Sequence, residues 1–118
     1  MATRIIYTMA RNVDWREAET HGAYQGSTND RADGFIHFST AAQVVASAAK
    51  HRAGETDLLL VAVESDRLGA ALKWEPARGG QLFPHLYAAL SLNDVLWAKP
   101  LPLGSDGQHL FPAFEDKC

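Results

Sequence analysis

The sequence has little cysteine, no long apolar run and no cluster of basic residues. Its one cysteine among 118 residues is the last residue, Cys118, which argues against disulfides and thiolate metal sites and favours a reducing compartment. The longest strongly apolar run is LLLVAV at 58–63, far shorter than the roughly 20 residues that a membrane-spanning helix needs. The first ten residues lack the apolar stretch of a secretory signal. We therefore expect a cytoplasmic protein with no membrane segment.

Charge and motif content exclude further classes of protein. Eleven Lys and Arg against fourteen Asp and Glu give a net charge of −3, and the basic residues are scattered singly, so no nucleic-acid-binding surface is indicated. The chain has no GxGxxG, GxxxxGK[ST], HExxH or GxSxG motif. Apolar residues make up 47% and charged residues 21%, as in ordinary globular domains. The length fits a single domain over residues 1–118.

Hydrophobic patterning predicts an α+β domain. Residues 57–65 read as a continuous apolar strand at the centre of a sheet. Residues 23–33 are polar and rich in turn formers, so they are predicted to form a surface loop that acts as a lid. Pro84 and Pro100 should confine the last two strands to edges or strand ends. The remaining predicted elements are strands over 4–10, 34–39, 72–75, 82–90 and 93–103, and helices over 12–22 and 40–54.

Capping signals define the predicted helix ends. Thr40 and Gln43 have the spacing of a capping box at the start of the second long helix. Asn12 or Asp14 is the expected N-cap of the first helix, and Gly22 is its expected stop.

The stretch GFIHFST at 34–40 places a histidine in an apolar strand. Alternation puts His37 and Ser39 on one face and Ile36 and Phe38 on the other, which is the natural core side. His37 would then project where a strand gives way to a helix, a place where polar groups converge on ligands. Its removal would on this reading cost little stability. The alternative is a structural histidine whose ring is satisfied by a backbone carbonyl.

The stretch FPHLY at 83–87 repeats this pattern. His85 and Tyr87 share one face, opposite Leu86. We predict that His37 and His85 open into one cavity, with Ser39 and Tyr87 on its wall.

Glu75 is a weaker candidate from the stretch LKWE at 72–75. Alternation places it opposite Trp74, either in solvent or turned into a cleft. His37, His85 and Glu75 would in principle suit a metal site with two histidines and one carboxylate. No close spacing supports that site, and we expect no metal.

The motifs GFIHxST at 34–40, WE at 74–75 and FPHxY at 83–87, with Trp15 in the first helix, resemble those of a known family. Its members are small, mostly bacterial proteins classified as a domain of unknown function. The resemblance covers nearly the whole chain. It implies a fold similar to that of ADP-ribosyltransferases, which is a split, strongly bent β-sheet with flanking helices.

The resemblance also implies roles for individual residues. In enzymes of that fold, a histidine or arginine on an early strand holds the nicotinamide ribose of NAD, and here His37 looks like the ribose-holding histidine, with Ser39 beside it. An aromatic residue stacks on nicotinamide, a role that falls to Tyr87 or Tyr24. The late catalytic glutamate has no clear counterpart: His85 stands in the later motif, and Glu75 and Glu115 are loose substitutes.

Two functions follow from the sequence. The first is binding of NAD or an ADP-ribose-like nucleotide in a cleft, with glycosyl or ADP-ribosyl transfer or NAD cleavage as the associated activity. In that case the catalytic candidates are His37, His85 and Glu75, and the ligand-binding candidates are His37, Ser39, Tyr87 and Tyr24. The alternative is a non-enzymatic module that binds or senses a small metabolite in the same cleft. A third reading is a structural protein whose histidines only satisfy core polarity.

Overall fold

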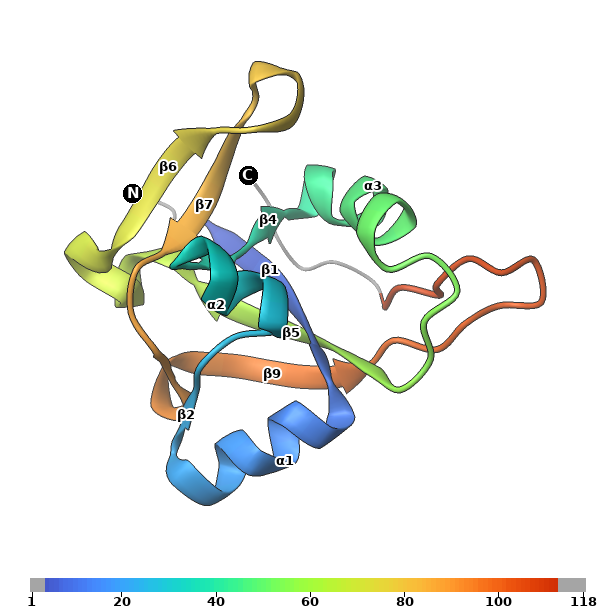
Figure 1. Cartoon of the computed structure of the whole chain (residues 1–118), viewed down its shortest axis with the longest axis horizontal. Coiled ribbons are helices and arrows are strands. Elements are labelled where there is room, and N and C mark those ends of the chain that lie inside the picture. The colour runs from blue at the N-terminus through green and yellow to red at the C-terminus, as the bar shows by residue number, and fades with distance from the viewer. Residues whose placement is uncertain (1–3, 113–118) are drawn as a thin grey trace.

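The structure is a computed structural model that describes residues 4–112. Its larger sheet has four strands in the order β4-β1-β5-β9, all antiparallel to their neighbours. They are β4 (Ser39–Thr40), β1 (Ile5–Arg11), β5 (Leu58–Glu64) and β9 (Val95–Pro100). Because β1 and β5 are the inner strands, most of their side chains are buried. This sheet is the main β-sheet of the domain (Figure 1).

A smaller antiparallel sheet has the order β3-β7-β6. Its strands are β3 (Ile36–His37), β7 (Leu82–Leu86) and β6 (Leu72–Pro76), and a separate pair joins β2 (Ala23–Tyr24) to β8 (Leu90–Ser91). The chain passes from the smaller sheet to the larger one within residues 36–40. Phe38 lies at the crossing, and its N–H donates to the carbonyl of Pro84 at 3.0 Å. The two sheets are thus joined by continuous backbone without a linker.

Three α-helices flank the sheets: α1 (Asn12–His21), α2 (Thr28–Asp33) and α3 (Ala41–His51). Three 3₁₀ segments complete the description: η1 (Ser65–Ala71), η2 (Arg78–Gly80) and η3 (Leu92–Asp94). In Figure 1 the β6–β7 hairpin extends at one end of the molecule and α1 lies at the opposite end. Within residues 4–112, no helix is both long and apolar enough to cross a membrane.

Strand β5 is buried on both faces, which explains its unbroken apolar sequence. Val61 and Val63 belong to one hydrophobic cluster, with Trp15 of α1 and Ile36 of β3. Leu58, Leu60 and Ala62 point to a second cluster, which also contains Val44 of α3. The domain therefore has apolar packing on each side of its main sheet, as the sequence predicted for a central strand at 57–65.

Most of the predicted elements are present. Strand β1, helix α1, strand β5 and strands β6, β7 and β9 lie within a few residues of the expected ranges. The capping box of α3 is confirmed, because the backbone N–H of Thr40 donates to Oε1 of Gln43 at 3.0 Å. Gly22 ends α1 in the left-handed conformation at φ 81°, where a residue without Cβ is favoured. Pro100 closes the edge strand β9 as expected.

Three local predictions were wrong. The N-cap of α1 is Arg11, not Asn12 or Asp14, and its side chain makes no capping hydrogen bond. The strand expected over 34–39 is divided at Phe38 between two sheets. Pro84 lies in the middle strand of its sheet rather than at an edge. Its register partner on β6 is Trp74. On the other side its carbonyl, which proline retains, accepts the hydrogen bond from the N–H of Phe38.

The segment 23–33 was also predicted incorrectly as a loop, since it contains β2 and α2. Helix α2 begins with a capping box in which Ser27 Oγ accepts from the N–H of Asp30 and Asp30 Oδ2 accepts from the N–H of Ser27. These bonds satisfy amides that would otherwise lack partners at a helix start. The polar residues that resembled a loop are therefore helix-initiating residues.

Candidate functional site

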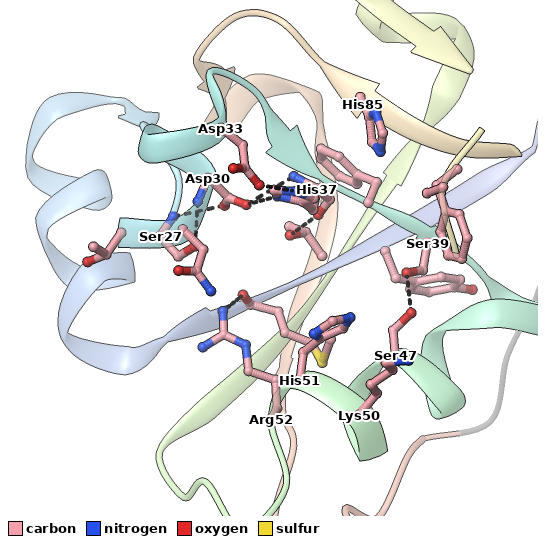
Figure 2. Close-up of a pocket in the computed structure, with 18 of the residues that line it drawn as sticks. Ser27, Asp30, Asp33, His37, Ser39, Ser47, Lys50, His51, Arg52 and His85 are labelled. Carbon is pink, nitrogen blue, oxygen red and sulfur yellow. Dashed lines mark hydrogen bonds and ion pairs between the residues drawn. The ribbon is translucent and has the colours of Figure 1, made fainter. Parts of the chain in front are cut away.

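A cavity of about 760 Å³ opens between α2, α3 and the strands β1, β3, β4 and β7. This volume lies within the range typical of small-molecule sites. Figure 2 shows Asp30, Asp33 and His37 on one side and Lys50, His51 and Arg52 from the end of α3 on the other. The cavity thus has one wall of carboxylates with an imidazole and a facing wall rich in cations.

Asp30 organises the first wall. Its side chain is buried, and its carboxylate accepts the N–H of Ser27 at 2.8 Å, the N–H of His37 at 3.1 Å and the Nδ1 of His37 at 2.5 Å. Burial is the largest influence on its pKa and raises it, but the hydrogen bonds from His37 and Ser27 outweigh burial, so the pKa of Asp30 is lowered. An ionised carboxylate therefore ties the start of α2 to β3.

His37 is held between two carboxylates. Its Nδ1 faces Asp30, and its Nε2 lies 3.0 Å from Oδ2 of Asp33. The hydrogen bond to Asp30 is the main cause of the raised pKa of His37, and the charges of both aspartates add to it against the effect of burial. Because each carboxylate can accept a hydrogen bond from the ring, the pair favours the form of His37 that carries a proton on both nitrogens. Removing this ring would leave the buried Asp30 with only its two backbone partners, so we now expect a cost in stability where the sequence indicated little.

His85 lies directly opposite His37 in the β3–β7 register. The two ring centroids are 5.6 Å apart, and both rings line the cavity. The Nδ1 of His85 lies 2.8 Å from Oε1 of Glu75, which also accepts the hydroxyl of Tyr87 at 2.7 Å. The hydrogen bond from His85 and then that from Tyr87 lower the pKa of Glu75. Phe35 stacks on His85 at 4.1 Å.

The structure brings together some of the predicted site residues and separates others. His37, Ser39 and His85 line the cavity, as their alternation indicated. Tyr87 and Glu75 do not line it, and the side chain of Tyr87 is exposed. These two residues reach the cavity only through His85.

Two further residues that were predicted to bind a ligand make contacts within the protein. Tyr24 is buried against Trp15 in the hydrophobic core, so its ring is not available to a ligand in the cavity. Ser39, a predicted ligand-binding residue, donates its hydroxyl to Ser47 of α3 at 3.1 Å. Glu115 and Cys118 lie outside the described residues.

Asp30 and Asp33 were not anticipated from the sequence. The signal was present in STND at 27–30, because Ser followed three residues later by Asp is a capping-box pattern.

Within residues 4–112, no group of three or more His, Cys, Asp or Glu side chains is arranged to hold a metal ion.

The second wall carries cations of differing availability. Arg52 is engaged, since it lies 3.1 Å from Glu55 and donates to the carbonyl of Met9. Lys50 forms no hydrogen bond or ion pair with any described residue, so among the described residues its ammonium group is left to solvent. A ligand that bridges the walls would therefore meet an uncommitted cation at Lys50.

Comparison with known proteins identifies the family. Residues 9–98 match the model of a family described as protein of unknown function (DUF952). The chain belongs to this family. The resemblance found in the sequence to a domain of unknown function is thereby confirmed.

Solved structures similar to this DUF952 chain come from Caulobacter crescentus. The crystal structure of protein CC0527 is 42% identical, with a TM-score of 0.87, over 90% of this chain and 93% of that chain. The solution NMR structure of CC0527 is 43% identical, with a TM-score of 0.79, over 88% and 90% of the two chains. No curated protein matches the chain. The fold of this chain is thus a mixed α+β fold shared with CC0527.

Proposed function

We propose that the cavity binds a nucleotide of the NAD or ADP-ribose type, in a fold similar to that of ADP-ribosyltransferases. The observation that carries this proposal is the pairing of walls: the imidazole of His37, held by the carboxylates of Asp30 and Asp33, faces the cationic end of α3. Hydroxyl groups of a ribose suit the first wall, because its carboxylates accept hydrogen bonds. Phosphate oxygens suit Lys50 on the second wall.

The architecture supports the comparison with ADP-ribosyltransferases. Residues 36–40 cross between a four-stranded and a three-stranded antiparallel sheet, which agrees with a split, bent sheet. In this comparison His37 takes the place of the ribose-holding histidine. Phe35, stacked on His85, is a nearby ring that the sequence comparison did not single out.

The position of Glu75 favours binding without cleavage as the second candidate function. A glutamate that stabilises a ribosyl cation must reach the ribose itself, but Glu75 is hydrogen-bonded to His85 and Tyr87 and does not line the cavity. A non-enzymatic module that senses a nucleotide needs no such residue. Release of nicotinamide from NAD during incubation with the protein separates the two candidates, because only an enzyme produces it.

The proposed ligand class can be tested by thermal unfolding with NAD, ADP-ribose, AMP and inorganic pyrophosphate. A ligand present at 100 times its Kd stabilises the folded state by about 2.7 kcal/mol. We expect NAD or ADP-ribose to raise the Tm, and Lys50→Gln to reduce the increase. Lys99→Gln is the matched control, since Lys99 packs over Trp97 and does not line the cavity. Absence of a shift with every compound would overturn the proposal, as would an undiminished shift in Lys50→Gln.

A further inference from the structure

The two histidines of the cavity differ in their hydrogen-bond partners. His37 has a carboxylate on each nitrogen, whereas His85 has one on Nδ1 only. The Nε2 of His85 makes no hydrogen bond to a described residue, and it is not among the buried side-chain atoms without a partner. His37 can therefore donate a hydrogen bond to a carboxylate from each ring nitrogen, whereas His85 can do so only from Nδ1.

We infer that His85 is a hydrogen-bond acceptor of the cavity, with Glu75 as the residue that positions it, and that its free Nε2 accepts a hydrogen bond from a ligand hydroxyl. This inference rests on the proposed function for the identity of the ligand. Both nitrogens of the neighbouring His37 are already paired with Asp30 and Asp33, so Nε2 of His85 is the ring nitrogen left for a ligand. A ribose hydroxyl can donate a hydrogen bond to it.

Neighbouring strands fix the orientation of the His85 ring. The carboxylate of Glu75 on β6 contacts Nδ1, and the hydroxyl of Tyr87, directly after β7, donates to the same carboxylate. The ring of His37 on β3 lies 5.6 Å away between ring centroids, and the register partner of His85 on β6 is Lys73. Stacking on Phe35 keeps the ring plane fixed.

The first experiment reads the proton positions directly by ¹⁵N NMR of histidine side chains in the full chain at pH 8. We expect His85 to be protonated on Nδ1 and unprotonated on Nε2. In Glu75→Gln the Nδ1 proton loses its ionic acceptor, so the proton should redistribute toward Nε2. Tyr87→Phe should leave the proton on Nδ1, and Glu19→Gln, on the exposed face of α1, is the control. A protonated Nε2 in the unaltered protein would overturn the inference, whatever ligand binds.

The second experiment uses diethyl pyrocarbonate, which reacts only with an unprotonated imidazole nitrogen, and locates the product by mass spectrometry at pH 7. The side chain of His37 is 41% exposed and that of His85 only 8%, so exposure alone predicts faster modification of His37. We expect the reverse, since each unit by which the pKa of His37 is raised slows its reaction about tenfold. His21, on the exposed end of α1, provides the reference rate. Faster modification of His37 than of His85 would contradict the inference.

Addition of ADP-ribose separates this inference from the proposed function. If ADP-ribose raises the Tm and slows modification of His85, both are supported. If it raises the Tm and leaves the modification of His85 unchanged, the ligand contact at Nε2 is wrong while nucleotide binding stands. If it neither binds nor protects, the nucleotide assigned under the proposed function is wrong, and the hydroxyl contact inferred from it falls as well.

Discussion

Replacing Asp30 by Asn should destabilise the protein far more than the same replacement at Asp33. Both aspartates lie on α2 and contact the same imidazole, but the side chain of Asp33 is 54% exposed and that of Asp30 only 7%. The two variants remove one charge each from one helix. Their comparison therefore isolates burial and hydrogen bonding.

The magnitude follows from the three hydrogen bonds that the Asp30 carboxylate accepts. Hydrogen bonds to charged groups are worth about 1.5–3 kcal/mol each, and an unsatisfied buried donor costs about 1–3 kcal/mol. If the side-chain oxygen of the introduced asparagine keeps the hydrogen bonds from His37, its NH₂ group points at the backbone N–H of Ser27. Two hydrogen-bond donors then face each other, and neither has an acceptor. We expect Asp30→Asn to lose about 3 kcal/mol of unfolding free energy. Asp33→Asn should lose less than about 1 kcal/mol, as exposed ion pairs do.

Urea unfolding followed by circular dichroism measures both losses. For a chain of this size, a loss of 3 kcal/mol corresponds to a fall in Tm of about 10 °C. Equal losses in the two variants, or a larger loss for Asp33→Asn, would refute the conclusion that Asp30 organises the wall. A ligand-free preparation is used for both, because bound ligand would stabilise them unequally.

The same contact predicts how the loss depends on pH. The pKa of Asp30 is lowered, so its contribution is present above its unfolded value near 3.9 and disappears as pH falls through the folded pKa. The pKa of His37 is raised, so its contribution is complete below about 6.5 and disappears as pH rises through the folded pKa. The difference between the unaltered protein and Asp30→Asn should therefore be largest between about pH 4 and 6.5. A difference that grows above pH 7 would contradict this.

Three further predictions concern α2 and its surroundings. Gly26→Ala should cost about 1–3 kcal/mol, because Gly26 has φ +98° and a Cβ there would lie 2.7 Å from Cβ of Asp30, whereas Gly22→Ala places its Cβ in open space; equal costs in chemical denaturation would argue against the clash. Tyr24→Phe should leave stability unchanged or raise it by up to about 1 kcal/mol, since the hydroxyl is buried without a partner among the described residues, and a clear fall in Tm would disprove this. By hydrogen exchange, amides of residues 28–33 should exchange faster than those of 58–64 if α2 acts as a lid, and equal protection would exclude that role.

The sequence was sufficient for features that depend on periodicity within one element. The unbroken apolar run of β5 predicted a strand buried on both faces, and two faces of hydrophobic packing are found. Alternation placed each histidine opposite its apolar neighbours, and in the small sheet the two histidines are register partners. Because strand alternation is a property of the local backbone, no knowledge of partners was needed.

The contacts that define the site depend on registers and turns, which periodicity does not specify. Glu75 reaches His85 because the β6–β7 register aligns Lys73 with His85 and Glu75 with Phe83, and a different hairpin register would separate them. Asp30 reaches His37 because α2 ends at Gly34, whose φ of 89° turns the chain back along the helix. That conformation is easy for glycine, but the sequence alone does not show where the turned chain leads.

The crossing of residues 36–40 between the two sheets limits how a ligand can enter the cavity. Ser39 pairs with Tyr7 in the larger sheet, and His37 pairs with His85 in the smaller one, so only buried Phe38 separates the two pairings. The two sheets have little freedom to move apart, because a large separation would disrupt the strand pairing on both sides of Phe38. Helix α2 belongs to neither sheet, and its side chains contact β3 through Asp30 and Asp33. A movement of α2 would therefore change the entrance of the cavity without breaking a sheet hydrogen bond, whereas a movement of the sheets would break such bonds.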